Sequence, residues 1–270
     1  MSRGSSPPQL RLTERGEGEP VLLLHGLGAS AHVWDPLVAQ AGVGFHFISL
    51  DLPHCGQAEP WAKLTPMDVA EKLADRLGRG GSGAAWVLGH SFGGVTALQL
   101  AAIAPNLVRG VTAVAAPAMG LGPLKVVLNT SLADWTMRVA SLVKPSAKAV
   151  RAYLEFIWGS GAPPTPGQIQ GYLMSMEAEG HHEATLLALR SLAEFALPSE
   201  QLGASGIPLH LVFGERDRLV PPAVGSELSK ALSATLWIVR GAGHCIPEER
   251  PDVLDEHLRA MHGMALQETA

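Results

Sequence analysis

Short apolar runs in this chain alternate with segments in which apolar residues recur every three or four positions. The runs are short enough for buried strands, and they lie at residues 21–24, 45–50, 85–88, 108–115, 208–213 and 235–239. The segments between them carry helix start and stop signals, and they lie at residues 30–40, 65–77, 93–104, 222–232 and 251–261. Strands that alternate with helices at this spacing pair in parallel through right-handed crossovers. We therefore expect an α/β fold with a mostly parallel sheet flanked by helices.

The start of the chain departs from this alternation. Residues 1–8 contain no apolar core and are expected to form a disordered tail. Residues 10–13 then alternate between apolar and polar side chains, and a glycine-containing turn follows at residues 15–18. This pattern predicts that residues 10–13 form a strand pair with residues 21–24.

A long internal segment has helical spacing only. Between residues 117 and 198 the apolar positions follow a helical period, and the breaks fall at Pro145, at residues 159–164 and at Gly180. Strand-like alternation is missing from this segment. We expect an inserted helical cap (a lid) at residues 117–198, with residues 1–116 and 199–270 forming the core domain.

Composition narrows the class of protein. The chain has 270 residues, of which 47% are hydrophobic and 17% charged, with a net charge of −5. This balance excludes extensive disorder and offers no basic patch for nucleic acid and no polybasic membrane anchor. The sequence shows neither a secretory signal nor an uninterrupted apolar stretch that could span a bilayer. We expect a cytoplasmic protein whose partner is a small molecule, and its oligomeric state is left open.

The most informative motif surrounds Ser91. Residues 85–88 predict a buried strand, Gly89-His-Ser-Phe-Gly93 follows, and a segment rich in good helix formers comes next. A serine between a strand and a helix sits in a tight turn that exposes its hydroxyl. This G-x-S-x-G arrangement resembles the nucleophile elbow of the α/β-hydrolase superfamily. The resemblance to capped members covers residues ~20–115 and ~205–262, while no motif in residues 117–198 can be matched.

Two further motifs supply partners for a serine nucleophile, which needs a base and an acid to orient that base. In the family the chain order is Ser, acid, His. The loop Gly214-Glu-Arg-Asp217 is similar to the family's acid loop, and Gly241-Ala-Gly-His244 is similar to the loop that carries the base. Asp217 and His244 each follow a predicted strand, at the sheet edge where such folds place their sites. Ser91, Asp217 and His244 are therefore the predicted catalytic residues.

The resemblance also implies an oxyanion hole and a substrate pocket. His25-Gly-Leu-Gly28 resembles the family's H-G loop, so the backbone N–H groups of Leu27 and Phe92 are the expected oxyanion donors. His25 is expected to brace this loop rather than to react. Side chains or backbone at Gly26, Trp135, Trp158 and Val220 are proposed for the substrate pocket.

Other motifs indicate no cofactor and no metal. The glycines at 26–28 lack the third glycine and the acid of a dinucleotide-binding motif. Cys55 and Cys245 form no metal quartet and are expected to be small buried residues, and His181-His182 is expected to be a solvated pair.

Three functions remain open. The first is a serine hydrolase that cleaves a carboxylic ester through an acyl-enzyme intermediate, with lactones and thioesters as related substrates. The second is hydrolysis of a C–C bond in a vinylogous diketone on the same triad, which the apolar character of residues 117–198 disfavours. The third is a non-enzymatic ligand-binding or accessory protein on the same fold.

Overall fold

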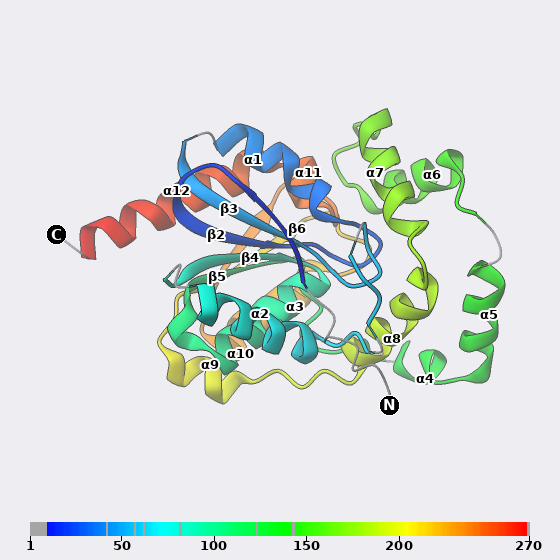
Figure 1. Cartoon of the computed structure of the whole chain (residues 1–270), viewed down its shortest axis with the longest axis horizontal. Coiled ribbons are helices and arrows are strands. Elements are labelled where there is room, and N and C mark those ends of the chain that lie inside the picture. Colours follow the sequence, from blue (N-terminus) through cyan, green and yellow to red (C-terminus); the bar gives the residue numbers. More distant parts are fainter. Residues whose placement is uncertain are drawn as a thin grey trace, which may run out of the picture.

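The six apolar runs form the parallel strands of a seven-stranded sheet in the computed structural model of the chain (Figure 1). The structure describes residues 10–41, 43–56, 58–61, 63–80, 83–122, 124–141 and 144–268. The expected tail at residues 1–8 lies outside these residues. The strands follow the spatial order β1-β3-β2-β4-β5-β6-β7. Their bounds are Arg11–Arg15, Gly18–Leu24, Gly44–Asp51, Ala85–His90, Val108–Val114, Leu209–Gly214 and Thr235–Val239 for β1 to β7.

Six of the seven strands run parallel, as the alternation of strands and helices predicts. Strand β2 pairs with β3 and β4, and the parallel ladder continues through β5, β6 and β7. The predicted pairing of residues 10–13 with residues 21–24 is wrong, because β1 pairs antiparallel with β3 instead. Both edges of β2 are already occupied by parallel neighbours, so β1 can only extend the sheet beyond β3.

Helices cover both faces of the sheet (Figure 1). One face is covered by α2, α3, α9 and α10, which span Pro66–Gly80, Phe92–Ile103, Ser199–Ser205 and Pro222–Leu232. The other is covered by α1, α11 and α12, which span Asp35–Ala41, Ile246–Glu249 and Pro251–Glu268. Short 3-10 turns occupy Ala31–Trp34 (η1) and Pro105–Leu107 (η2). The helix expected at residues 30–40 is thus divided into η1 and α1, since Pro36 has no N–H and stands in the first turn of α1.

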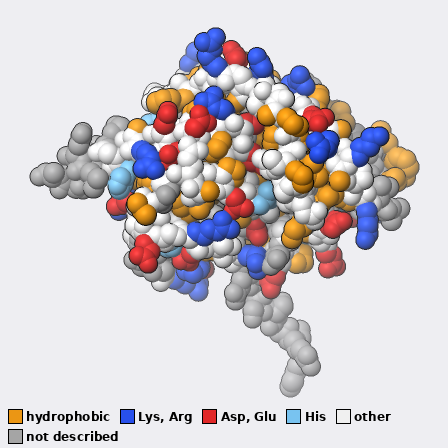
Figure 2. Space-filling view, turned by 90° about the horizontal axis from the view of Figure 1, so that it is seen from above, with side chains coloured by type: hydrophobic (Ala, Val, Ile, Leu, Met, Phe, Trp, Pro, Cys, Tyr) orange, Lys and Arg blue, Asp and Glu red, His pale blue; other side chains and the backbone are white. Residues whose placement is uncertain are grey.

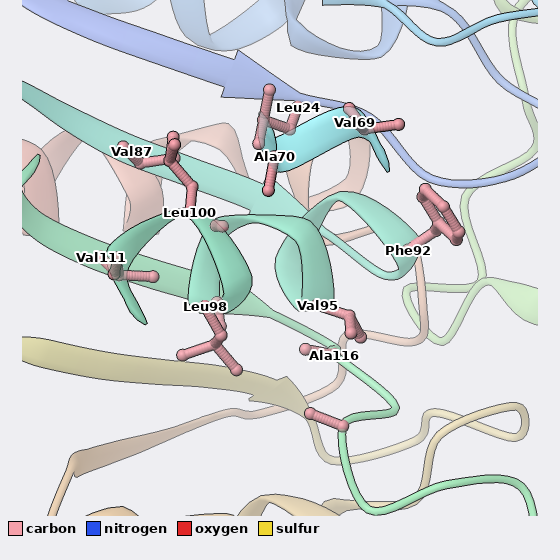
Figure 3. Packing of buried hydrophobic residues seen from close by; sticks show 14 of the residues in the cluster. Leu24, Val69, Ala70, Val87, Phe92, Val95, Leu98, Leu100, Val111 and Ala116 are labelled. Atoms are coloured by element: carbon pink, nitrogen blue, oxygen red, sulfur yellow. The ribbon is translucent and has the colours of Figure 1, made fainter. Parts of the chain in front are cut away.

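The core consists of two apolar layers separated by the sheet. Leu24, Val87 and Val111 of the strands pack against Val95 and Leu98 of α3 in the first layer (Figure 3). On the opposite face the sheet packs against α1 and α12. Helix α3 is buried around nearly its whole circumference, because α2, α9 and the sheet all contact it. Its N-terminus is therefore held rigidly against the sheet.

Of the helices that the structure describes between β5 and β6, all but α9 extend beyond one end of the sheet (Figure 1). These inserted helices are α4 to α8, and their bounds are Leu124–Leu128, Ser131–Ser141, Ala147–Ile157, Pro166–Met176 and His181–Ala193. Helix α7 begins with a complete capping box between Thr165 and Gln168, which satisfies backbone N–H groups at the start of the helix. Within the described residues, no helix combines the length and the apolarity needed to cross a bilayer.

Candidate active site

Ser91 occupies a strained turn between β4 and α3. Its φ of 53° lies in the left-handed region, which a residue with a side chain adopts at a cost of ~1–3 kcal/mol. A β-carbon at Gly89 would collide with the backbone of Gly93, and one at Gly93 would collide with the carbonyl groups of Leu24 and His25. The two glycines therefore allow β4, α3 and β2 to approach closely enough to hold this turn. The Ser91 N–H is fixed by donating to the carbonyl oxygen of Val114 on β5, at 2.8 Å.

Asp217 and His244 form a buried pair. The Nδ1 atom of His244 lies 2.8 Å from Oδ2 of Asp217. The other carboxylate oxygen of Asp217, Oδ1, accepts hydrogen bonds from the backbone N–H groups of Leu219 and Val220 at 2.8 and 2.9 Å. Since a carboxylate only accepts, the proton of His244 belongs on Nδ1, and Nε2 is left free to accept a proton.

Ser91 and His244 line the same cavity, which has a volume of about 410 Å³. The loop carrying Asp217 follows β6 and the loop carrying His244 follows β7, so all three predicted residues stand at the carboxyl ends of parallel strands. This edge is where open parallel sheets form their sites. The described hydrogen bonds include none between the Ser91 hydroxyl and His244. In the absence of substrate such contacts are often long and tighten only in the reacting complex.

Two backbone amides near Ser91 have no protein acceptor among the described residues. The N–H groups of Leu27 and Phe92 donate to no protein group among the described residues. Leu27 lines the cavity, and Phe92 is the first residue of α3, where the first-turn N–H groups have no acceptor within the helix. Both amides are therefore available to a negatively charged oxygen, and the positive end of the α3 dipole favours such a charge.

His25 and Gly26 shape the loop that precedes Leu27. The His25 Nδ1–H donates to the carbonyl of Gly26 at 2.7 Å, and its Nε2 accepts from the N–H of Leu52 at 2.8 Å. Burial lowers the pKa of His25, which keeps this ring neutral. Gly26 itself does not line the cavity. A β-carbon there would press against the side chains of Ser91 and His90, at 3.0 and 3.1 Å.

His90 connects the turn at Ser91 to the loop that carries His244, a contact that no sequence motif predicts. Its Nε2–H donates to the backbone carbonyl oxygen of His244 at 2.8 Å, and the two ring centroids are 4.9 Å apart. Burial and the neighbouring His244 lower the pKa of His90 to about 3. His90 also contributes to the cavity wall, and its buried Nδ1 has no hydrogen-bond partner among the described residues.

The inserted helices supply much of the cavity wall, and that wall is largely apolar. The apolar residues that they contribute are Met137, Ile157, Met176, Leu189 and Leu192. Val220, which was proposed for the pocket, lines the cavity as well. Trp135 and Trp158 were also proposed but are not among the lining residues. Trp135 faces outward with 62% of its surface exposed, and Trp158 is buried in the second core layer.

Polar residues of the inserted helices also reach the cavity. His181, His182 and Thr185 of α8 lie in its wall, and His181 is buried with its Nδ1 3.0 Å from the carbonyl oxygen of His54. The expectation of a solvated histidine pair is therefore wrong for His181, because α8 packs over the loop that contains His54. Sequence offered no signal for this contact between segments 127 residues apart.

The two cysteines are buried and free, as expected. Cys245 lines the cavity beside His244. Burial and the nearby carboxylate of Glu248 raise the pKa of its thiol well above the ordinary value, so it remains protonated. Within the described residues, no group of three or more His, Cys, Asp or Glu side chains is placed to hold a metal ion.

Comparisons with known proteins agree with this architecture. Residues 19–251 match the family model described as "alpha/beta hydrolase fold". The chain is 30% identical over 219 residues to a pimeloyl-[acyl-carrier protein] methyl ester esterase of Neisseria meningitidis serogroup A. The aligned region covers 81% of this chain and 68% of the relative. It is 26% identical to an esterase of Mycobacterium tuberculosis, covering 91% of this chain and 83% of that protein.

Solved structures show the same arrangement of elements. A thermophilic esterase from Thermogutta terrifontis superimposes with a TM-score of 0.76 over 93% of this chain and 92% of that chain. The two sequences are 22% identical, so this likeness bears on the fold alone.

Proposed function

Since the chain belongs to the alpha/beta hydrolase fold family, we propose that it is a serine hydrolase that cleaves carboxylic esters through an acyl-enzyme intermediate. The observation that carries this proposal is the shared cavity. Ser91, in its strained turn, and His244, hydrogen-bonded to the buried Asp217, both line this cavity, and Nε2 of His244 is free to accept a proton. Relatives named as esterases support the same class of reaction.

In the proposed reaction, Ser91 attacks the ester carbonyl carbon while His244 Nε2 takes the hydroxyl proton. Asp217 holds the imidazole in the tautomer that leaves Nε2 free. The amides of Leu27 and Phe92 donate to the oxygen that becomes negative, and removing one such donor typically costs ~3 kcal/mol of transition-state stabilisation. His244 then protonates the departing alcohol. Water activated by the same nitrogen releases the acid and regenerates Ser91.

The cavity supports substrates with an apolar acyl group of small to medium size. Its volume of about 410 Å³ lies at the lower end of the range for small-molecule pockets, and most of its lining side chains are hydrophobic. We also infer that residues 117–198 act as a cap, because the cavity is lined by both the inserted helices and the loops after the strands. The apolar wall favours esters over the vinylogous diketones of C–C hydrolases.

The test is turnover of p-nitrophenyl esters of graded chain length, with lactones, thioesters and a vinylogous diketone alongside. We expect hydrolysis of short and medium esters by the natural protein, and a loss of at least ~10³-fold in Ser91→Ala. A fluorophosphonate probe should label the natural protein and leave Ser91→Ala unlabelled. Equal ester turnover by the two proteins would contradict the proposal, and turnover of the diketone alone would replace it.

A further inference from the structure

An apolar stripe faces solvent on α4 and α5, two of the inserted helices. Five large hydrophobic side chains within fourteen consecutive residues are exposed, and we call them the outer stripe: Val126, Val127, Leu132, Trp135 and Val139. The exposed fraction reaches 74% for Val126 and 62% for Trp135. Single exposed hydrophobic residues are normal, whereas a contiguous group of them marks a surface that meets a partner.

Helix α5 carries apolar side chains on two faces, and only one of them is needed for packing. Leu132, Trp135 and Val139 are spaced three and four residues apart and share one side of the helix. Met137 points the other way, where it packs with Leu186 of α8 and lines the active-site cavity. The inner face therefore accounts for the docking of α5 onto the molecule, and the outer stripe remains without an internal role.

Basic residues accompany the outer stripe. Residues 124–148 contain the four cations Lys125, Arg138, Lys144 and Lys148 and one carboxylate, Asp134, in a chain whose net charge is −5. The carboxylate of Asp134 is 3.0 Å from Arg190 of α8, and Lys125 is 3.9 Å from the carboxylate of Glu194, so both of these charges have partners. Lys144 lines a hollow that it shares with three carboxylates, Glu177, Glu179 and Glu183. Hydrophobic and basic side chains lie together over the end of the molecule that the inserted helices form (Figure 2). The outer stripe is therefore flanked by the cations Arg138 on α5 and Lys148 at the start of α6, and the ion pairs of the described residues include neither of them.

We propose that the outer stripe is a docking surface for membranes that contain anionic lipids. Trp, Leu and Val side chains on one side of a helix enter the boundary between headgroups and acyl chains, while flanking Lys and Arg contact lipid phosphates. A second copy of the chain fits this surface less well. A symmetric dimer would place the same patch against itself, with the cations of one copy facing those of the other.

This inference goes beyond the proposed ester hydrolysis, since it states where the protein meets apolar compounds. Through Met137 the helix that would lie on the lipid is also a wall of the cavity. Compounds with an apolar acyl group partition into bilayers, so docking here places the cavity next to their highest local concentration. Binding itself requires no catalytic residue.

The test is co-sedimentation of the full chain with vesicles of phosphatidylcholine alone and with 30% phosphatidylglycerol (about a third of the lipid, enough for a marked surface charge). We expect the protein to sediment with the anionic vesicles and to be released as the salt concentration rises. The double variant Leu132→Ser/Val139→Ser should lose at least ~5-fold in vesicle affinity, and Arg138→Gln should weaken binding to anionic vesicles. Ser91→Ala should bind as the natural protein does, which separates this proposal from the assignment of the nucleophile.

Matched controls remove an exposed apolar residue or a cation far from the outer stripe. Val43 is 93% exposed in the turn before β3, at the opposite end of the sheet strands from the cavity, and Val43→Ser should bind vesicles unchanged. Lys230→Gln on α10 is the corresponding control for charge. The emission that Trp135 contributes, taken as the difference between the natural protein and Trp135→Phe, should move to shorter wavelength on anionic vesicles.

Three outcomes would overturn the proposal. The natural protein could stay in the supernatant with both kinds of vesicle, or Leu132→Ser/Val139→Ser could bind as well as Val43→Ser. Light scattering could also show a dimer for the natural protein and a monomer for Leu132→Ser/Val139→Ser. That last result would make the outer stripe an interface between copies of this chain.

Discussion

The two carboxylate oxygens of Asp217 have different hydrogen-bond donors. Oδ1 accepts from two backbone N–H groups, and Oδ2 faces His244 Nδ1. In Asp217→Asn the same N–H groups would select the amide oxygen for the Oδ1 position, and the NH₂ group would then face the imidazole. His244 Nδ1 could only accept from it, so the proton would move to Nε2, where it opposes the abstraction of the Ser91 proton.

We therefore expect Asp217→Asn to lower kcat for a p-nitrophenyl ester by ~10³–10⁴-fold, with KM changed by less than a few-fold. The measurement is steady-state kinetics on the ester that the natural protein prefers. The free energy of unfolding from urea titration provides the control, because a folded variant should unfold in a single cooperative transition. A variant with kcat within ten-fold of the natural value would show that Asp217 does not orient the base.

We infer that His90 positions His244, the proposed base, through the backbone. Its Nε2–H is the donor to the His244 carbonyl, and it stays neutral because its pKa is lowered to about 3. In His90→Phe a planar, slightly larger ring replaces the imidazole and the donor is lost, so the loop after β7 is released from the elbow. We expect kcat to fall ~10-fold or more with little change in KM.

The conservative variant His90→Gln separates positioning from packing. The Gln amide nitrogen reaches about as far as Nε2 and can donate to the same carbonyl, so most of the lost kcat should return. Equal kcat values for His90→Phe and His90→Gln would contradict the role assigned to this hydrogen bond. A rise in KM with kcat unchanged would assign His90 to substrate binding instead.

At the scale of elements, the approach of α3 to β2 sets the position of the elbow. A β-carbon on Gly93 would collide with the backbone carbonyl groups at the end of β2. Because these are backbone atoms rather than the ends of flexible side chains, they cannot move aside easily. We expect Gly93→Ala to lower the free energy of unfolding by ~3 kcal/mol or more, at or above the upper end of ordinary overpacking. Urea unfolding followed by circular dichroism measures this change.

Gly78 in α2 is the matched control, because a β-carbon there meets no atom within 4 Å. Gly78→Ala should raise the free energy of unfolding by ~0.5–1 kcal/mol, the gain in helix propensity. Gly93→Ala and Gly78→Ala with the same stability would show that the contact between α3 and β2 is looser than the structure indicates.

The alternation of strand and helix could be predicted because each element has its own hydrophobic period. Spatial neighbours could not be predicted in the same way. Strand β1 was assigned to the wrong partner, since a strand pattern indicates that a strand exists and not which edge it joins. The ends of β4, β6 and β7 were predictable, and so was the edge at which Ser91, Asp217 and His244 lie.

The pocket was less predictable than the strand ends. The inserted helices are apolar on more than one side, and periodicity cannot tell the side that faces a cavity from the side that faces a core or solvent. Trp135 and Trp158 were proposed for the pocket on this basis, whereas Met137, two residues from Trp135, lines the cavity. His90 and His181 depend on contacts between distant segments, which no local pattern carries.

At the scale of the whole molecule, buried histidines lower the free energy of unfolding at acid pH. Burial lowers the pKa of His90 to about 3, and that of His32 and His257 to about 4. Each group is neutral in the folded state and takes up a proton more readily when unfolded, at its ordinary value of 6.5. Their stabilisation is therefore complete above pH 6.5 and is lost as the pH falls from 6.5 toward 3.

We expect the melting temperature to decrease steadily between pH 6.5 and pH 4. His257→Gln should show a smaller decrease over that interval, since Gln keeps a polar partner for the Thr112 hydroxyl, 3.1 Å from His257 Nε2, without a titrating ring. Differential scanning calorimetry of the two proteins across this range is the measurement. Parallel decreases in both would show that His257 does not contribute to acid unfolding.

Glu248 makes the stability of the folded protein decrease as the pH rises, whereas the buried histidines make it decrease as the pH falls. It lies at α11 beneath the inserted helices, where Tyr172 of α7 donates to its Oε2 at 2.8 Å. Burial raises its pKa from 4.5 to about 7, so the folded state holds this proton more tightly than the unfolded state does. The resulting stabilisation is complete below pH 4.5 and is lost as the pH rises through 7.

A shift of this size corresponds to ~3 kcal/mol between the two limits. Glu248→Gln keeps an acceptor for the Tyr172 hydroxyl and removes the titration. We therefore expect Glu248→Gln to be more stable than the natural protein at pH 8 and to lose that advantage on going to pH 5, in urea titrations at both values. A constant difference at the two pH values would show that Glu248 is ionised throughout, and that the contact between α7 and α11 is a charged one.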